Sequence, residues 1–219
     1  MNDEITCRLR QDPVLAALIE QHGPYQPRPP AADPYAALVR AIVYQQLAGA
    51  AAGTIHARLL ALSQQTHSDG DALTPGPVQL LDLSDSTLRA AGLSGPKIGY
   101  LRDLAARCLS ADPNQRPGFD DLPALDDSTV IERLTAVKGI GQWSAQMFLI
   151  FQLGRLDVLP VDDLGVRKGM HRAYRLRKLP SPRRMHEISR RWRPYRSVAS
   201  WYLWASLENE PLAREPQAR

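Results

Sequence analysis

Two adjacent aspartates, Asp162 and Asp163, lie in the stretch LPVDDLGV (159–166), between an extended apolar run and a predicted helix. Pro160 biases Leu159 toward an extended backbone, which delivers both carboxylates to the start of that helix. A carboxylate at a helix N-terminus accepts amide hydrogen bonds and stays ionised. One aspartate is enough to cap the helix, so the pair offers a second carboxylate for chemistry. A fixed anion can stabilise a developing positive charge, and it can orient or deprotonate a water molecule.

Upstream of this pair, two glycines flank one isoleucine in LTAVKGIGQWSA (134–145), between two predicted helices. Gly139 and Gly141 permit a tight turn that approaches another molecule closely, because no Cβ is in the way, and Ile140 can anchor the turn in the core. The amides at the start of the second helix then point outward with the positive end of the helix dipole, which suits a phosphate. An ordinary αα-hairpin with a glycine turn is the alternative. The full stretch, more than the two glycines, favours the phosphate site.

Positive charge is concentrated in the last third of the chain. The net charge of the 219 residues is only +4, but the segment from Arg167 to Arg196 holds twelve Lys and Arg against one acid, Glu187, for a net +11. The rest of the chain carries a net −7. A solvated basic face is one interpretation of such a run. Its length and charge on an otherwise acidic protein favour a polyanion, most simply nucleic acid.

The composition excludes several other classes of protein. Hydrophobic residues make up 44% of the chain and charged residues 23%, which is typical of a globular protein with a buried core. The cysteines, Cys7 and Cys108, are too few for a disulfide framework or an iron–sulfur cluster, and no Cys/His set has the spacing of a zinc site. The N-terminal MNDEITCRLR lacks an apolar signal core, and no run approaches the length of a transmembrane helix. We therefore expect an intracellular protein in a reducing compartment.

The elements that must position these residues are helical nearly everywhere, because apolar residues recur with the helical period. Predicted loops are 67–80 and 110–127, and Thr129 and Glu132 have the spacing of a capping box. Helices are predicted over 33–49, over 50–62, over 84–109 with a tight turn at 92–96, over 128–153 with the glycine turn, after Asp163, near 182–191, and from 194 to about 208. The chain is therefore predicted to be all-α, with roughly ten helices and no clean linker.

Four stretches resemble the helix-hairpin-helix DNA glycosylases, in which a Gly/Pro-rich segment after the hairpin ends in an aspartate. Within that superfamily the chain is most similar to the 3-methyladenine DNA glycosylase II (AlkA-like) group. The stretches are IVYQQLAGAAAGTI, AAGLSGPKIGYLRDLA, LTAVKGIGQWSAQMFLIFQLGRLDVLPVDDLGVRKG and WRPYRSVASWYLWA. The resemblance implies a single domain over 1–219 with two helical lobes, an active cleft between the lobes, a hairpin at 129–153 and a catalytic loop at 154–166. One departure from the bacterial prototype is expected: the prototype carries an additional N-terminal α/β domain, for which this chain has no room.

The same resemblance assigns roles to single residues. The family's catalytic aspartate directly precedes the helical run, so it falls on Asp163, and Asp162 becomes a cap, a partner of Asp163 or an electrostatic helper. Family members that also cut the strand carry a lysine at the position of Trp143, which predicts a monofunctional enzyme here. The base pocket is assigned to flat or polarisable side chains, which attract cationic alkylated bases. These are Trp143, Trp204, Met147 (where the prototype has tyrosine) and Tyr44.

DNA contacts and a cation follow from the resemblance as well. Lys138 stands where many relatives have proline, and the turn at Ser94 and Gly95 matches the loop that presses into the gap left by an extruded base. The predicted DNA-binding residues are Lys138, Gly139, Ile140, Gly141, Gln142, Ser94, Gly95, Arg167 and Lys168. Gln45 and Gln46 could support the flipped nucleotide or hydrogen-bond between helices. No cofactor is required, and the backbone carbonyls of Thr135, Val137 and Gly139 could hold a structural monovalent cation.

The predicted function is hydrolysis of the N-glycosidic bond of alkylated bases in duplex DNA, by base flipping, to leave an abasic site in base excision repair. The alternative is a non-catalytic helix-hairpin-helix DNA-binding module, which has no use for the aspartate pair. A glycosylase with lyase activity conflicts with Trp143. The expected partner is double-stranded DNA with alkylated bases and not a membrane. We expect a monomer in the cytoplasm, associated with the nucleoid if the source is bacterial.

Overall fold

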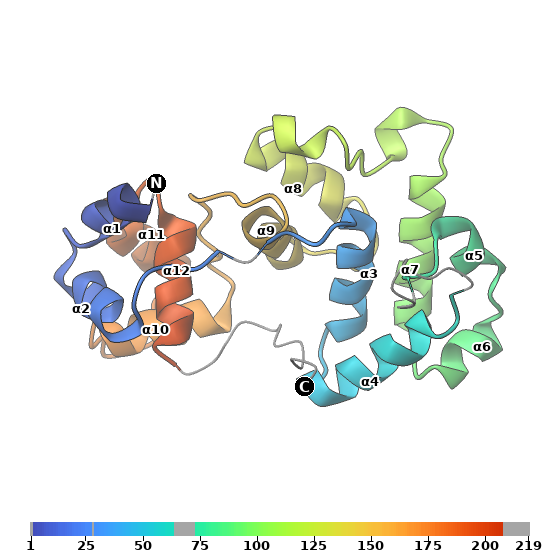
Figure 1. Ribbon diagram of the computed structural model, residues 1–219, viewed down its shortest axis with the longest axis horizontal. Helices are drawn as coiled ribbons and strands as arrows, with labels where there is room; N and C mark the ends of the chain where they lie inside the picture. Colours follow the sequence, from blue (N-terminus) through green and yellow to red (C-terminus); the bar gives the residue numbers. More distant parts are fainter. Residues whose placement is uncertain (1, 28, 64–72, 208–219) are drawn as a thin grey trace. The chain divides into compact units, whose positions relative to one another are not determined.

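The computed structural model describes residues 2–27, 29–63 and 73–207, and all the regular secondary structure within these ranges is helical (Figure 1). The all-α prediction is therefore confirmed. The described part of the chain forms twelve α-helices and three short 3₁₀ helices: α1 (Asn2–Leu9), α2 (Pro13–His22), α3 (Pro34–Tyr44), α4 (Gly49–Leu60), α5 (Pro77–Asp82), α6 (Asp85–Ala90), α7 (Gly95–Cys108), η1 (Pro113–Gln115), η2 (Leu122–Ala124), α8 (Asp127–Thr135), α9 (Gln142–Phe151), α10 (Leu164–Ala173), α11 (Pro182–Ser189), η3 (Arg190–Trp192) and α12 (Arg196–Ala205).

Three α-helices differ from the sequence prediction, and the short η1 and η2 lie within the segment predicted as loop at 110–127. Helices α1 and α2 were not predicted, although α2 has a clear start signal: Asp12 accepts a hydrogen bond from the Val14 amide at 3.0 Å, and Pro13 follows it in the first turn. Helix α5 begins with Pro77 inside the segment predicted as loop. Its six residues are too short for the helical period to stand out against the neighbouring Gly, Pro and Asp.

The chain divides into two compact units. Residues 1–30 and 149–219 form one, called here the terminal unit, and residues 31–148 form the other, called the central unit. In the terminal unit α12 packs against α2 and α10 (Figure 1), and Tyr202, Leu203 and Trp204 of α12 are buried there. In the central unit α7 packs against α3 and α5, and α3 also packs against α4.

A buried polar cluster joins the two chain segments of the terminal unit. The Asp12 side chain is 2% exposed, and its Oδ2 accepts hydrogen bonds from the Tyr174 hydroxyl at 2.6 Å and from the Trp192 indole N–H at 3.2 Å. Burial, followed by the hydrogen bond to Asp12, raises the pKa of Tyr174 above its ordinary value. The start of α2 is thus tied to the end of α10 and to η3. Among the described residues, no helix is long and apolar enough to cross a bilayer.

Candidate active site and DNA-binding hairpin

The hairpin in the central unit is formed by α8, a six-residue turn and the start of α9, as predicted. The capping box predicted at Thr129 and Glu132 is wrong, because the N-cap of α8 is Asp126. One Asp126 oxygen accepts the Thr129 amide at 3.0 Å, and the other accepts the Thr129 hydroxyl at 2.7 Å. A hydrogen bond from the Ser128 hydroxyl, followed by the two from Thr129, holds the pKa of the exposed Asp126 carboxyl well below its usual range.

The two glycines of the turn have different tasks. Gly139 has a φ of +81°, in the left-handed region, and a Cβ at this position would collide with the ring of Tyr100. A Cβ on Gly141 would meet nothing within 4 Å. Gly139 is therefore required by packing within the protein, and only Gly141 leaves its surface open to another molecule. Ile140 is 4% exposed and anchors the turn in the core, as expected.

Helix α7 holds the hairpin turn through Asp103. One carboxylate oxygen accepts the Lys138 amide and the Arg107 Nε, both at 2.9 Å, and the other lies 3.6 Å from the Lys138 ammonium. Partial burial opposes ionisation of Asp103, but the hydrogen bonds from Lys138 and Arg107 outweigh it and lower the pKa of this carboxyl. The Lys138 side chain is 75% exposed, so its charge remains accessible to a phosphate.

Helix α3 also reaches the turn. The side-chain amide of Gln45, at the C-cap of α3, donates a hydrogen bond to the Gly139 carbonyl at 2.8 Å. Of the two roles considered for Gln45, the structure shows the hydrogen bond between elements. Gln46 follows with a φ of +57°, a backbone conformation that is uncommon outside glycine, and its side chain is exposed. The end of α3 is held on its other side by Lys97, whose ammonium donates to the Val43 carbonyl at 2.6 Å.

The carbonyls predicted to hold a cation partly fit that task. The Gly139 carbonyl already accepts the Gln45 amide, and the Val137 carbonyl accepts the Ile140 amide at 3.1 Å. A carbonyl oxygen has two lone pairs, so each can accept one more partner. A cation at the hairpin would thus share the Gly139 carbonyl with the Gln45 amide. Its coordination by these two carbonyls and by that of Thr135 remains a prediction.

The predicted base-contacting residues of the central unit are partly exposed. Trp143 and Met147 are half-buried and lie one turn apart on α9, so they share a face of that helix. Tyr44 is half-buried at the end of α3, with the Arg40 guanidinium 4.1 Å from its ring centroid and His56 at its edge. These positions are compatible with the predicted pocket, and their role there stays a prediction.

The turn before α7 also has predicted contacts to DNA. Ser94 is the N-cap residue of α7 but makes no side-chain cap hydrogen bond, and Gly95 is the first helical residue. Both are exposed, as are Gly141 and Gln142 of the hairpin. The first amides of α9 have no acceptor within their helix, which suits the predicted phosphate contact.

In the terminal unit, the structure distinguishes the two aspartates. Asp163 is the N-cap of α10 and is 9% exposed, whereas Asp162 is exposed in the preceding turn. Asp163 Oδ1 accepts the Val166 amide at 2.7 Å and the Trp204 indole N–H at 2.8 Å. The capping role considered for Asp162 is therefore wrong. The residue fixed in orientation is the one that the sequence assigned to catalysis.

Trp204 contacts this carboxylate by its nitrogen edge. The indole is 4% exposed and stacks on Phe151, with ring centroids 5.8 Å apart. A Cβ on Gly165 would lie 2.8 Å from Trp204 Cδ1 and 3.0 Å from Asp163 Oδ1, so only glycine lets the first turn of α10 come this close. The sequence did not predict the hydrogen bond between Trp204 and Asp163, and the predicted stacking of a base on Trp204 is untested.

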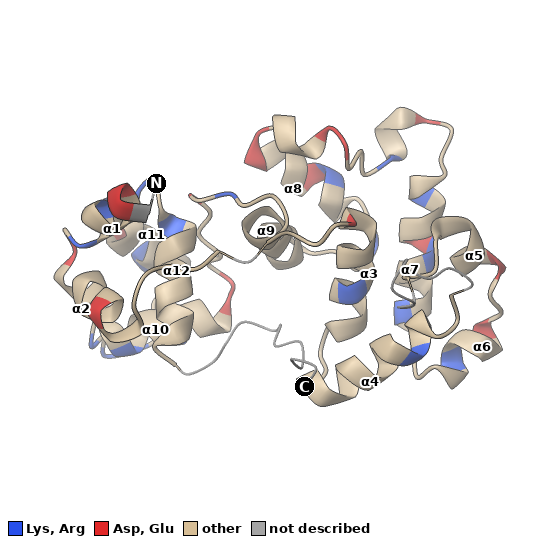
Figure 2. Ribbon diagram, viewed as in Figure 1, with Lys and Arg blue, Asp and Glu red and all other residues tan. Residues whose placement is uncertain are grey.

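The basic run begins directly after the aspartates. Figure 2 shows Lys and Arg on both α10 and α11, which include Arg167, Lys168, Arg183 and Arg184. Arg167 is half-buried and donates to the Pro180 carbonyl at 3.3 Å, whereas Lys168 is exposed. Arg183 and Arg184 both pair with Glu187, the single acid of the run. Of the two predicted contacts on α10, Lys168 is thus the more accessible.

Comparison with known proteins identifies the family of the chain. A family model described as "HhH-GPD superfamily base excision DNA repair protein" matches residues 39–194. DNA-3-methyladenine glycosylase 1 of Schizosaccharomyces pombe is 37% identical over 172 residues, which cover 78% of this chain and 72% of that protein. The structure of an S. pombe 3-methyladenine DNA glycosylase in complex with abasic DNA has a TM-score of 0.81 and 32% identity, covering 97% of this chain and 100% of that one. A DNA-3-methyladenine glycosidase of Bacillus halodurans has a TM-score of 0.76 and 39% identity, with coverage of 93% and 88%. The chain belongs to the HhH-GPD superfamily of base excision DNA repair proteins.

Proposed function

We propose that this protein is a monofunctional DNA glycosylase that hydrolyses the N-glycosidic bond of alkylated bases in duplex DNA. The observation that carries the proposal is the Asp163 carboxylate, buried and fixed at the start of α10 by two N–H donors. Relatives named as DNA-3-methyladenine glycosylases support a substrate of the 3-methyladenine or 7-methylguanine type. A DNA-binding module without activity has no need of such a carboxylate.

The chemistry follows from the charge of Asp163. When the bond between the base and C1′ breaks, the base leaves with the bonding electrons and positive charge develops on the sugar. A fixed carboxylate stabilises this charge without reorganising. Water then adds its oxygen to C1′ and loses a proton, for which Asp163 is the available acceptor. The products are the free base and an abasic site.

The base must leave the duplex before any carboxylate can act on it. Alkylation weakens base pairing and lowers the cost of extrusion, which favours damaged bases over normal ones. A purine methylated at N3 or N7 also carries positive charge, and aromatic faces such as that of Trp143 attract cations. Because a cationic base is already a good leaving group, little acid catalysis is needed for its release.

Strand cleavage requires an amine that attacks C1′ and forms a Schiff base. In lyase members of the superfamily a lysine of the hairpin supplies this amine. The corresponding residue here is Trp143, and its indole cannot form a Schiff base. We therefore propose water as the nucleophile and an intact strand as the product. The hairpin contributes binding only: its helix N-terminus and Lys138 hold a phosphate, and a monovalent cation on the turn carbonyls would add charge there. The protein acts where the DNA is, in the cytoplasm with the nucleoid if the source is bacterial.

The test is release of free base from duplex DNA methylated at purine nitrogens. Free bases are separated by chromatography, and abasic sites are detected as breaks that form only after alkali. We expect release of 3-methyladenine and 7-methylguanine, with no breaks before alkali and no covalent complex after borohydride. Binding without release would mean a non-catalytic module, and a borohydride-trapped complex would mean a lyase. Comparable release of neutral hypoxanthine from a matched duplex would refute the preference for charged bases.

A further inference from the structure

Helix α12 contacts the catalytic loop at both of the loop's ends. In the structure the segment that joins α9 to α10 is 152–163, which ends at Asp163, and the name catalytic loop is used for it from here on. Residues of the first turn of α12 bind the beginning of the loop, at 155–158, and residues of the last turn bind Asp163 and the start of α10. All of these residues belong to the terminal unit.

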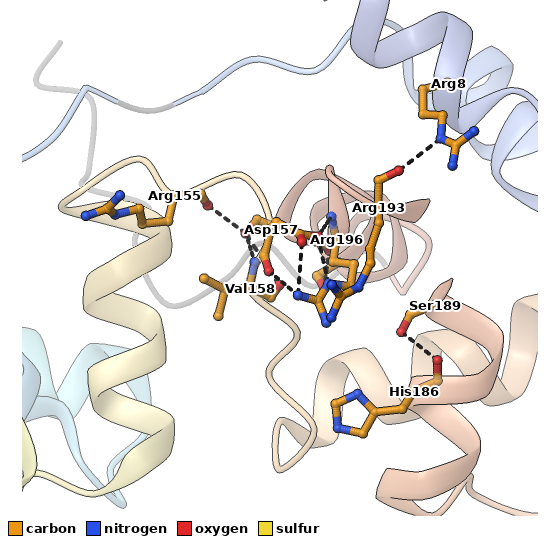
Figure 3. A network of polar contacts seen from close by, with 10 residues as sticks. Arg8, Arg155, Asp157, Val158, His186, Ser189, Arg193 and Arg196 are labelled. Atoms are coloured by element: carbon orange, nitrogen blue, oxygen red, sulfur yellow. Dashed lines mark hydrogen bonds and ion pairs between the residues drawn. The ribbon is translucent and has the colours of Figure 1, made fainter. Parts of the chain in front are cut away.

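The first contact is a fork between Arg196 and Asp157 (Figure 3). Arg196 Nε donates to Asp157 Oδ1 at 2.7 Å, and Nη2 donates to Oδ2 at 3.0 Å and to the Asp157 carbonyl at 2.7 Å. The Arg196 side chain is only 13% exposed. Paired guanidinium–carboxylate bonds of this kind fix direction as well as distance. The fork therefore sets both the side chain and the backbone of Asp157.

The second contact is Ser197, which is 2% exposed. Its hydroxyl donates to the Arg155 carbonyl at 2.7 Å and accepts the Val158 amide at 3.0 Å, while its own amide donates to the Leu156 carbonyl at 2.9 Å. Figure 3 shows this network around Val158 and Arg196. One serine thus binds three loop residues through their backbone.

At the other end of α12, the contacts fall on Asp163 and α10. Trp204 donates to the Asp163 carboxylate, and its ring fills the space over Gly165. A Cβ on Gly169, one turn further along α10, would collide with the Leu203 carbonyl. The last turn of α12 and the first turns of α10 are consequently packed backbone to backbone.

The distances explain why two anchors are needed. Ser197 and Trp204 are seven positions apart in the helix, so the helix holds its two anchors about 10 Å apart along its axis, at 1.5 Å per residue. Val158 and Asp163 are five positions apart in the loop, and an extended chain of that length could span about 17 Å. The extended loop could therefore be several ångströms longer than the span between the two anchors, whereas the helix has a fixed length. With the first anchor released, the beginning of the loop would be free to shift, and Asp163 would lose one of the constraints that add to its bonds with Trp204 and Val166.

We propose that α12 is the template that positions the Asp163 carboxylate, with Arg196 and Ser197 as positioning residues for base release. The inference rests on the proposed function, because it assigns to these residues an effect on the same reaction. Neither residue acts on the substrate. They keep the loop in the geometry in which Asp163 faces the developing charge, and a displacement of about 1 Å at such a group can cost about 100-fold in rate.

The experiment compares Arg196→Lys and Ser197→Ala with the wild-type full chain on a methylated duplex. Lysine keeps the charge but loses the fork, and alanine removes only the hydroxyl bonds. We expect the single-turnover rate of base release to fall about 10- to 100-fold, with the affinity for DNA changed less than about threefold. The matched control is Arg102→Lys, since Arg102 also bonds a carboxylate and a carbonyl, Asp85 at 2.6 Å and Leu83 at 3.0 Å, but in the central unit. That variant should release base at the wild-type rate.

Two further measurements separate positioning from a general loss of structure. In an Asp163→Asn background, Arg196→Lys should cause no additional loss of rate, because the group that it positions is already inactive. Hydrogen exchange of the Val166 amide, which donates to Asp163, should become about tenfold faster or more in either anchor variant. Unchanged release and unchanged exchange would overturn the inference. If the wild-type protein releases no base, the proposed function fails, and the exchange of Val166 still decides whether α12 positions Asp163.

Discussion

Replacing Asp163 with asparagine separates the charge of this side chain from its structural hydrogen bonds. Asparagine keeps an oxygen that can accept the Val166 amide and the Trp204 indole N–H, which now lie 2.7 and 2.8 Å from Asp163 Oδ1. Asparagine and aspartate are also similar as helix caps, so the free energy of unfolding should fall by less than about 1 kcal/mol. The charge that stabilises the developing cation is lost. We expect base release to slow by about 100-fold or more, which corresponds to ~2.7 kcal/mol of transition-state stabilisation.

Alanine at the same position gives the structural part of the effect. Asp163→Ala removes a carboxylate that is 9% exposed and that accepts hydrogen bonds from two N–H donors. Leaving a buried N–H without a partner costs about 1–3 kcal/mol, so the alanine variant should lose about 2–6 kcal/mol of stability. The asparagine and alanine variants should therefore be similar in rate and different in stability.

The assay combines three measurements on each variant. Urea unfolding gives stability, fluorescence anisotropy with a methylated duplex gives the affinity for DNA, and single-turnover base release gives the chemical step. Asp162→Asn is the control, since it makes the same change one residue earlier, on an exposed side chain. We expect Asp162→Asn to lose less activity than Asp163→Asn and to keep the affinity for DNA. A larger loss in Asp162→Asn would refute the assignment within the pair, and near-normal release by Asp163→Asn would refute the electrostatic mechanism.

Three other expectations can be checked with the same protein. Gly165→Ala places a Cβ 2.8 Å from the Trp204 ring and should lower the free energy of unfolding in urea by about 1–3 kcal/mol. The control Gly99→Ala, whose Cβ would meet nothing within 4 Å, should raise that free energy by up to about 1 kcal/mol. Equal stabilities of the two variants would contradict the close packing at Gly165. Affinity for DNA should fall steeply as the salt concentration rises. Lys138→Ala should reduce the slope of log K against log salt by about 0.9, because one phosphate contact is lost. An unchanged slope would mean that Lys138 does not contact phosphate. The lowered pKa of Asp103 means that its ionised form is favoured by folding, so its contribution is complete above the ordinary aspartate pKa of ~3.9 and is lost as pH falls through the folded pKa. The difference in melting temperature between wild type and Asp103→Asn should accordingly be largest near neutral pH and shrink in acid, and a difference independent of pH would count against the ionised contact.

The sequence predicted those parts of the site that depend on local pattern. The hairpin helices follow from their period, the turn follows from Gly139 and Gly141, and the helix after the aspartates follows from its cap. Local pattern could not decide which aspartate is the cap, because Asp162 and Asp163 have the same chemistry and adjacent positions. The structure separates them through burial, which depends on the packing of α10 against α12.

The contacts that fix Asp163 could not be predicted for a different reason. Trp204 lies 41 residues from Asp163, and Arg196 lies 39 residues from Asp157. Neither pair follows a helical or strand period, so no local rule connects them. In the sequence Trp204 offers an aromatic face, and nothing indicates a carboxylate partner for its indole N–H. In the sequence Arg196 is simply the last charge of a basic run, whereas in the structure it is mostly buried in an ion pair.

The terminal unit is assembled from both ends of the chain, and this has a consequence for synthesis. The hairpin lies in the central unit, which is complete once Phe148 has been made, whereas α1 and α2 must wait for α12 before they can bury their apolar faces. At about 5–20 residues per second, the 57 residues from Leu149 to Ala205, where α12 ends, take about 3–11 s to translate. During that interval the nascent chain carries the hairpin but lacks the helix that fixes Asp163.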